Sequence, residues 1–267
     1  MATEKVVVIG AGPAGLAAAQ QLKLYGINPL VFEEDQPGGL LLNASSVTNY
    51  PGVSRGTAGR DLVKLFPLPE KLIFHRVTSV KKEGSVYRVA LSYTDSVTAL
   101  TVVVASGTTP RKIHVNCTPD SRILYDVKNI RDIPGDTVAV IGGGDAALDY
   151  AVSLSSKFSV TVYARGNFSD AVPHLLTSVK KISRITLRPE TSGKTVIPEK
   201  TIFVAAGRTP AVDFVSEELL SAPPDDGSFH MCGDCSNGIF RQTAIAVGNG
   251  VEAAMKTAAY LRKLSAL

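Results

Sequence analysis

The sequence contains few cysteines: Cys117, Cys232 and Cys235 are the only three in 267 residues. A low, odd number supplies no disulfide framework and is typical of proteins in a reducing compartment. Cys232 and Cys235 have the Cys-x-x-Cys spacing of a redox pair, although a Gly-Asp pair with a different use lies between them. The four histidines show no metal-ligand spacing, so we expect no metal site.

The sequence also lacks long apolar runs and blocks of one charge. No run approaches the ~20 residues that a membrane-spanning helix needs, and no leader pattern precedes the first predicted strand near Lys5. The net charge of +4 is spread without lysine runs or interleaved basic and aromatic residues, which argues against nucleic-acid binding. We therefore expect a globular cytoplasmic protein that binds neither membrane nor nucleic acid.

A glycine-rich turn follows the apolar run at residues 6–9, which is typical of a buried parallel strand. The first glycine of such a turn permits a tight bend, and the second lets the backbone approach a pyrophosphate. The third small residue lets the next helix pack closely. The candidate dinucleotide-binding residues are Gly10, Gly12, Pro13, Ala14 and Gly15.

The residues after this turn complete a strand–helix–strand unit. Residues 16–24 are predicted to form a helix and residues 28–32 the next strand. Glu33 follows Gly15 by 18 positions, near the ~20-residue offset at which an acid meets a ribose hydroxyl. The N-terminus of the helix would bind the phosphates, because its free N–H groups and its dipole favour anions.

A second glycine-rich turn repeats this arrangement after the apolar run at residues 138–141. Its candidate nucleotide-binding residues are Gly142, Gly144, Asp145, Ala146 and Ala147. After the next predicted strand, residues 160–163, the position of the acid holds Ala164, followed by Arg165. An arginine in place of a carboxylate favours a 2′-phosphate, and so NADPH over NADH, unless Arg165 is only a solvated surface residue. Two dinucleotides on one chain indicate electron transfer from a nicotinamide to a flavin.

Two similar segments that contain glycine and proline, residues 105–110 and 205–210, flank the second glycine turn. We call them breakers, because glycine and proline interrupt regular secondary structure. Strands predicted at residues 71–77, 86–91 and 98–105 would form a small sheet before the first breaker. We predict an α/β protein with two Rossmann-like domains. The first domain is discontinuous, residues 1–110 and 206–267, and the second, residues 111–205, is the NAD(P)H-binding domain and is inserted into it. We expect Gly107 to reach the dinucleotide of the first domain and Gly207 the NADPH, with a hinge at Pro110 and Gly207.

A third motif lies after the second breaker. Gly233 and Asp234 precede Arg241, Gln242 and Thr243, and an alanine-rich helix follows. A Gly-Asp at the end of a strand can bind a sugar hydroxyl through its carboxylate. The N-terminus of the following helix can lie against the pyrimidine edge of a flavin, where negative charge accumulates on reduction.

In this order the motifs resemble the low-molecular-weight thioredoxin reductase family over nearly the whole chain. The resembling segments are Gly10–Gly15, Gly38-Gly39-Leu40-Leu41, Asn49-Tyr50-Pro51-Gly52, Gly233-Asp234 and Arg241-Gln242. The resemblance implies FAD in the first domain, a pyridine nucleotide in the second, and a homodimer. It implies that Glu33 binds the adenosine ribose, that Asp234 binds the ribityl or pyrophosphate region, and that Asn49 and Gln242 lie along the flavin. Gly39 and Leu40 also belong to this expected FAD site, although Leu40 replaces the glutamine of the family.

The resemblance fails at the redox dithiol. Thioredoxin reductases have a Cys-x-x-Cys shortly before the second glycine turn, and counting back from Gly142 places Tyr125 and Lys128 at those positions. Residues 123–128 and 142–151 resemble instead the ferredoxin–NADP reductases of the same fold. Those reductases usually have a C-terminal extension that covers the flavin, which we do not expect here because the sequence ends soon after the last predicted helix.

We therefore predict a flavin-dependent oxidoreductase in which NADPH, or alternatively NADH, delivers hydride to FAD. The electrons then pass to ferredoxin or another redox protein. The cofactors supply the chemistry, so no catalytic side chain is expected. Two alternatives remain: reduction of thioredoxin or a small disulfide through Cys232 and Cys235, and a flavin-binding protein without NADPH-dependent activity. A group of basic residues suits acidic ferredoxin, the 2′-phosphate or simple solvation, and consists of Lys180, Lys181, Arg184 and Arg188.

Overall fold

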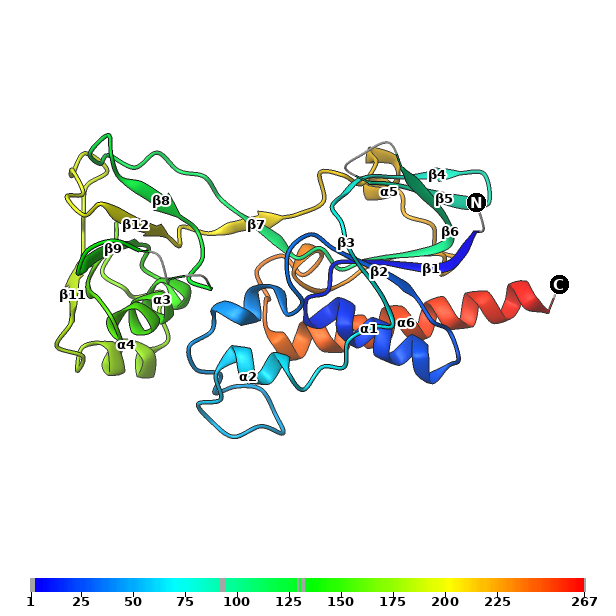
Figure 1. The fold of residues 1–267 in the computed structure, drawn as a ribbon, viewed down its shortest axis with the longest axis horizontal. Coiled ribbons are helices and arrows are strands. Elements are labelled where there is room, and N and C mark those ends of the chain that lie inside the picture. The colour runs from blue at the N-terminus through cyan, green and yellow to red at the C-terminus, as the bar shows by residue number, and fades with distance from the viewer. Residues whose placement is uncertain (1–2, 92–94, 129, 131–132, 267) are drawn as a thin grey trace.

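The computed structural model describes residues 3–91, 95–128, 130 and 133–266, and it has two lobes joined by a narrow ribbon (Figure 1). A mixed seven-stranded sheet forms the centre of the first lobe, and a parallel five-stranded sheet forms the centre of the second. Both sheets are accompanied by helices, which confirms the predicted α/β class. Within the described ranges, no helix is both long and apolar enough to cross a membrane.

The sheet of the first lobe divides at its longest strand, β6. One side of β6 pairs with β1, whereas on the other side β5 pairs with the N-terminal half and β14 with the C-terminal half. The predicted strands at 71–77, 86–91 and 98–105 therefore do not form a separate small sheet, because β3 pairs with β2 and the long β6 joins β5 to β1. The path is β3-β2-β1-β6-β5-β4, with bounds β1 Glu4–Ile9, β2 Leu30–Glu33, β3 Lys71–Phe74, β4 Val77–Glu83, β5 Val86–Leu91, β6 Ser96–Val104 and β14 Phe229–Met231.

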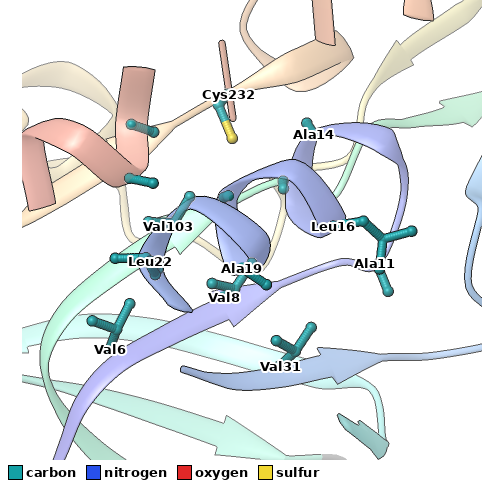
Figure 2. Packing of buried hydrophobic residues seen from close by; sticks show 14 of the residues in the cluster. Val6, Val8, Ala11, Ala14, Leu16, Ala19, Leu22, Val31, Val103 and Cys232 are labelled. Atoms are coloured by element: carbon teal, nitrogen blue, oxygen red, sulfur yellow. The ribbon is translucent and has the colours of Figure 1, made fainter. Parts of the chain in front are cut away.

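Two helices pack on each other beneath this sheet, α1 (Pro13–Leu24) and α6 (Thr243–Ser265). Leu16 and Leu22 of α1 lie in a core with Val103 of β6 (Figure 2). Gly250 lets the two helices approach, since a β-carbon there would lie 2.1 Å from the carbonyl oxygen of Ala14. The shorter helical segments of this lobe are α2 Gly59–Val63, α5 Glu217–Ser221, and 3-10 turns η1 Gly39–Asn43 and η2 Gly233–Cys235.

The second lobe has the strand order β11-β10-β9-β12-β8. Neighbouring parallel strands need crossover connections, and α3 (Asp145–Ser155) supplies the one from β9 to β10. Between β10 and β11 lies α4 (Pro173–Val179). The strands are β8 Arg122–Leu124, β9 Thr137–Ile141, β10 Ser159–Tyr163, β11 Ile185–Arg188 and β12 Thr201–Val204. This arrangement places the second glycine turn at the carboxyl end of β9, where α/β folds bind ligands.

The ribbon between the lobes consists of β7 (Thr108–Pro110) and β13 (Arg208–Pro210), which pair antiparallel. The two breakers, far apart in the sequence, are therefore neighbours in space. The domain boundaries at 110/111 and 205/206 lie next to this ribbon, and they stay a prediction, as does the hinge.

Candidate cofactor-binding sites

The first glycine turn has the geometry that a bound phosphate requires. Gly10 has a φ of +100°, and a β-carbon there would lie 2.4 Å from the carbonyl oxygen of Ala105, so only glycine fits. Gly15 packs against this bend, because its β-carbon would lie 1.8 Å from the Gly10 carbonyl oxygen. Gly12 is the N-cap of α1, and no side chain caps the N–H groups of the first turn. Such uncapped N–H groups are ready to bind an anion.

A cavity of about 300 Å³, here called the first cavity, adjoins this turn. The predicted FAD-binding residues that line it are Gly10, Gly12, Pro13, Ala14, Glu33, Gly39, Leu40, Gly107, Asp234, Arg241, Gln242 and Thr243. Three predicted residues do not line it. Gly15 packs against backbone, a β-carbon on Gly233 would meet the Ala14 side chain, and Asn49 donates a hydrogen bond to Oε1 of Gln242 at 2.8 Å.

Glu33 is buried at the end of β2, beside the first turn. Its Oε2 accepts a hydrogen bond from the N–H of Ala11 at 2.7 Å, and its Oε1 accepts one from the N–H of Asp35 at 3.0 Å. Burial raises the pKa of this carboxyl, and the two backbone N–H groups offset part of the rise. The side chain is therefore held against the cavity wall, with lone pairs left for a ribose hydroxyl.

The lining of the first cavity also combines a carboxyl group, two arginines and a helix N-terminus. Burial raises the pKa of Asp234, against the opposing effect of Arg241 and Arg208. Arg241 donates from Nη1 to the carbonyl oxygen of Arg208 at 3.1 Å, and its buried Nε has no hydrogen-bond partner in the described structure. α6 begins here with Gln242 as its N-cap, and the Gln242 side chain does not cap the first N–H groups of the helix. An orphaned donor and uncapped N–H groups fit a ligand with a polar acceptor edge, as a flavin has.

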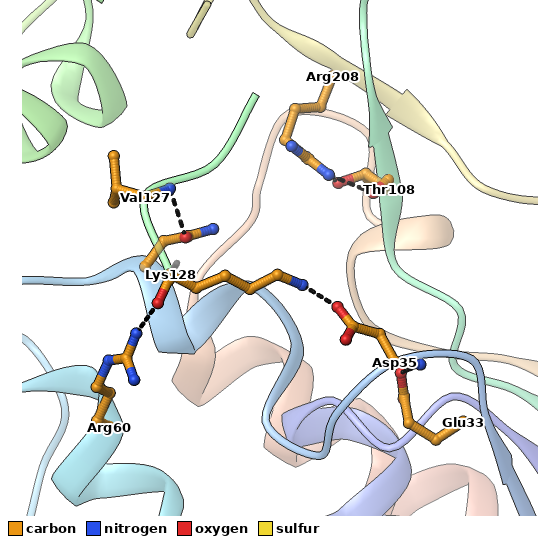
Figure 3. A network of polar contacts seen from close by, with 8 residues as sticks. Glu33, Asp35, Arg60, Thr108, Val127, Lys128 and Arg208 are labelled. Carbon is orange, nitrogen blue, oxygen red and sulfur yellow. Dashed lines mark hydrogen bonds and ion pairs between the residues drawn. The ribbon is translucent and has the colours of Figure 1, made fainter. Parts of the chain in front are cut away.

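The second lobe also contributes to the first cavity, with Tyr125, Asp126 and Lys128. Lys128 forms an ion pair with Asp35 of the first lobe, and Arg60 donates to the Lys128 carbonyl oxygen (Figure 3). The N–H of Val127 donates to Oδ1 of Asn43 at 3.1 Å. Sequence spacing does not reveal contacts between lobes. One feature of the sequence pointed to this segment: Tyr125 and Lys128 occupy the positions at which thioredoxin reductases have their redox cysteines.

The second glycine turn repeats the geometry of the first. Gly142 has a φ of +150°, and a β-carbon there would lie 2.5 Å from the carbonyl oxygen of Ala205. Gly144 is the N-cap of α3, again without a side-chain cap. Ala147 is fully buried behind Gly142 and supports the turn rather than a ligand. The chain thus offers a second anion-binding helix N-terminus.

A second cavity, of about 670 Å³, adjoins this turn. The predicted residues that line it are Gly142, Gly144, Asp145, Ala146, Arg165 and Gly207. Arg165 is exposed, whereas Oδ1 of Asp145 accepts a hydrogen bond from the N–H of Val172 at 2.7 Å. Lining residues that sequence reasoning missed are Arg111, His114 and Asp170. The described residues include no group of three or more His, Cys, Asp or Glu that could hold a metal ion.

The sequence matches a known protein family over more than half of its length. Residues 4–171 match the family described as pyridine nucleotide-disulphide oxidoreductase. The chain belongs to this family. It is an oxidoreductase of the thioredoxin reductase type, which is a class of flavin-dependent NAD(P)H enzymes.

Relatives of this oxidoreductase extend over most of its length. It is 28% identical to a thioredoxin reductase of Borreliella burgdorferi over 307 aligned residues, which cover 97% of this chain and 92% of the relative. It is 28% identical to a ferredoxin–NADP reductase of Ignicoccus hospitalis over 235 residues, covering 76% of this chain and 77% of the relative. The crystal structure of Lactococcus lactis thioredoxin reductase aligns with a TM-score of 0.82 at 22% identity and covers 98% of this chain and 100% of that one. This likeness confirms the predicted fold of two Rossmann-like domains.

Among the described residues of this oxidoreductase, no cysteine lines the first cavity. All three cysteines are free, and Cys232 and Cys235 are 2% and 4% exposed. They pack in different core clusters, and burial raises the pKa of both thiols. The thiol of Cys235 donates to the carbonyl oxygen of Cys232 at 3.2 Å. Buried thiols with raised pKa values supply little thiolate, so this pair is poorly suited to disulfide exchange.

Proposed function

We propose that the chain binds FAD in the first cavity and NADPH in the second, and passes electrons from NADPH to a ferredoxin-like redox protein. The first cavity offers a partner for each part of FAD. The N-terminus of α1 suits the pyrophosphate, Glu33 the adenosine ribose, and the N-terminus of α6 the polar edge of the flavin ring. When bound, the flavin supplies the redox chemistry, and the protein supplies binding, orientation and electrostatics.

Side chains at the flavin end have separate roles in this proposal. Asp234 accepts a hydrogen bond from the ribityl chain, and the neighbouring Arg208 and Arg241 balance its charge. Asn49 fixes the amide of Gln242 through the 2.8 Å hydrogen bond, so that Gln242 presents a defined edge to the ring. The positive end of α6 stabilises negative charge on that edge.

NADPH is assigned to the second cavity on the uncapped N-terminus of α3 and on Arg165. The buried Ala164 leaves no carboxylate at the position where an acid would meet a ribose hydroxyl. Arg165 is exposed and lines the cavity, so its guanidinium can form a bidentate contact with a 2′-phosphate.

The observation that carries the choice of acceptor is the pair Tyr125 and Lys128, which line the first cavity at the positions of the expected dithiol. Without a thiol there, and with Cys232 and Cys235 buried, a one-electron carrier suits the site better than a protein disulfide. Basic residues exposed on the second lobe would complement an acidic iron–sulfur protein, and they are Lys180, Lys181, Arg184 and Arg188.

The first test is an anaerobic titration of the FAD-loaded protein with NADPH, followed at the flavin absorbance near ~450 nm. Bleaching at stoichiometric NADPH supports the proposal, and acceptors are then compared, ferredoxin before thioredoxin and small disulfides. If dithionite bleaches the flavin and NADPH does not, the chain is a flavin-binding protein with another electron source. The same titration with NADH tests the choice of nucleotide.

We further propose that the protein forms a homodimer through its first lobe. Large apolar side chains are exposed there, including Leu24 (74%), Leu65 (66%) and Phe240 (71%). Leu24 and Leu65 line one groove with Tyr50. Exposed apolar groups of this kind favour association. Light scattering tests the proposal, because a monomer has a mass of 28.2 kDa and a dimer twice that value.

A further inference from the structure

Lys128 reaches from the second lobe into the first cavity. Its ammonium pairs with Asp35, which follows β2 and lies two residues after Glu33 (Figure 3). The Lys128 side chain is only 20% exposed, whereas the lysines of the other described ion pairs are 46–76% exposed. A partly buried ion pair is screened less by solvent and salt than an exposed one. The Lys128 side chain is therefore largely shielded where it lines the cavity, although Asp35 is 54% exposed.

The charge of the cavity makes this cation important. Among the described lining residues, five are acidic and three are basic; the acids are Glu33, Glu34, Asp35, Asp126 and Asp234, and the bases Lys128, Arg208 and Arg241. Arg208 and Arg241 interact with Asp234, whereas Lys128 pairs with Asp35. Lys128 is thus the basic lining residue beside the acids that follow β2. A diphosphate is anionic and would meet net negative charge there without this lysine.

The backbone around Lys128 is held from both lobes. Arg60 donates to the Lys128 carbonyl oxygen, and Asn43 accepts the Val127 N–H at 3.1 Å. The hydroxyl of Tyr150 donates to the Tyr125 carbonyl oxygen at 3.1 Å. These contacts fix the segment that would hold a dithiol, so that the ammonium is already placed before a ligand binds. A ligand that binds to a preorganised charge loses less conformational entropy than one that must first order a mobile side chain.

We propose that Lys128 is an FAD-binding residue supplied by the nucleotide-binding lobe. Its charge offsets the acidic edge formed by Glu33 and Asp35 and attracts the FAD diphosphate. The inference depends on the proposed function of the first cavity and adds to it a contribution from the other lobe. Because the contacts that place Lys128 join both lobes, bound FAD and the docked arrangement of the lobes stabilise each other to the same extent.

The test measures the dissociation constant of FAD from the apoprotein, by the change in FAD fluorescence on binding. Lys128→Met removes the charge, Lys128→Arg keeps it, and Lys157→Met is the matched control on an exposed lysine of the same lobe. We expect Lys128→Met to raise the dissociation constant about tenfold or more, since hydrogen bonds to charged groups are among the stronger ones. Lys128→Arg should recover most of the loss, and Lys157→Met should bind as the wild type does.

Ionic strength separates charge from packing. At about 1 M salt, where the Debye length falls to ~3 Å, the difference between wild type and Lys128→Met should shrink. Equal FAD affinity of wild type and Lys128→Met overturns the inference and leaves the proposed function intact. Equal losses in Lys128→Met and Lys128→Arg at either salt concentration also overturn it, because they indicate packing alone. A wild-type protein that does not bind FAD overturns both proposals.

Discussion

Asp149 on α3 of the second lobe accepts two hydrogen bonds from Ser45 of the first lobe, one from the backbone N–H at 3.1 Å and one from the hydroxyl. Burial raises the pKa of the Asp149 carboxyl, the two hydrogen bonds from Ser45 lower it, and the nearby Asp145 raises it further. Together with the pair of Lys128 and Asp35, this contact holds the lobes in the arrangement described.

The raised pKa gives this contact a pH dependence. Between the ordinary value of 3.8 and the raised value, the folded protein binds more protons at Asp149 than the unfolded chain does. The contribution of Asp149 to the free energy of unfolding is fully present below pH 3.8, and it is lost as the pH rises through the raised pKa. Asp149→Asn cannot titrate, so the melting temperature of wild type minus that of Asp149→Asn should fall as pH rises from about 4. Thermal unfolding across a pH series measures this difference, and a difference independent of pH would contradict the assignment.

The close packing of α1 on α6 depends on Gly250. A β-carbon there would lie 2.1 Å from the carbonyl oxygen of Ala14, which is backbone and cannot rotate away. We expect Gly250→Ala to destabilise the protein by about 2–3 kcal/mol through overpacking and to weaken FAD binding at the shifted first turn. Gly248→Ala is the control on the same helix, because that position is exposed with no atom within 4 Å of the added carbon.

Gly248→Ala should stabilise the helix by about 0.5–1 kcal/mol, because alanine has the higher helix propensity. Thermal unfolding of both variants, with FAD affinity as the second readout, checks the pair. Equal changes in stability at the two positions would show that helix propensity, and not the contact with Ala14, determines the effect of Gly250→Ala.

The local parts of both sites could be predicted from the sequence. Gly10 and Gly142 stand in turns made of consecutive residues, where φ and close packing depend on chain neighbours. Glu33 follows the first turn at a distance fixed by one helix and one strand, so its place beside Ala11 could be expected. In the same way, Gln242 and Thr243 begin a helix whose start is marked in the sequence.

Other features depend on how distant segments pack and could not be predicted. Lys128 meets Asp35 across 93 positions, and this contact exists only because the lobes lie against each other. Within the ribbon, Arg208 donates hydrogen bonds to the side chain and to the backbone carbonyl of Thr108, which lies 100 positions earlier in the sequence. The prediction of a separate small sheet was wrong for a related reason. Strand length and alternation in the sequence do not determine with which strands a long strand such as β6 pairs.

Arg165 is expected to distinguish NADPH from NADH. Its guanidinium is the exposed basic group that replaces the acid of the first unit, and it lines the second cavity. Arg165→Ala should raise the KM for NADPH about 10- to 100-fold, because a charge-assisted contact is lost. The KM for NADH should stay nearly unchanged, because NADH has no 2′-phosphate. Steady-state flavin reduction with each nucleotide measures both values. Equal losses with the two nucleotides would place Arg165 at a part of the ligand that they share.

The buried cysteines should be dispensable for electron transfer. Cys232 and Cys235 are shielded from solvent, and burial raises the pKa of both thiols, whereas Cys117 is partly exposed. A thiol reagent should therefore react quickly with one cysteine of the native protein and with all three only after unfolding. The double variant Cys232→Ala, Cys235→Ala should keep the kcat for ferredoxin reduction, at a cost of about 1–2 kcal/mol in stability from the lost core packing.

Reduction of a small disulfide by wild type and by this double variant is the sharper comparison. If both are equally slow while NADPH bleaches the flavin in each, electrons leave the flavin without passing through a thiol. Loss of disulfide reduction in the double variant alone, with normal bleaching by NADPH, would assign the dithiol role to Cys232 and Cys235. That result would also require η2 to open during turnover, because in the docked structure neither sulfur lines the first cavity.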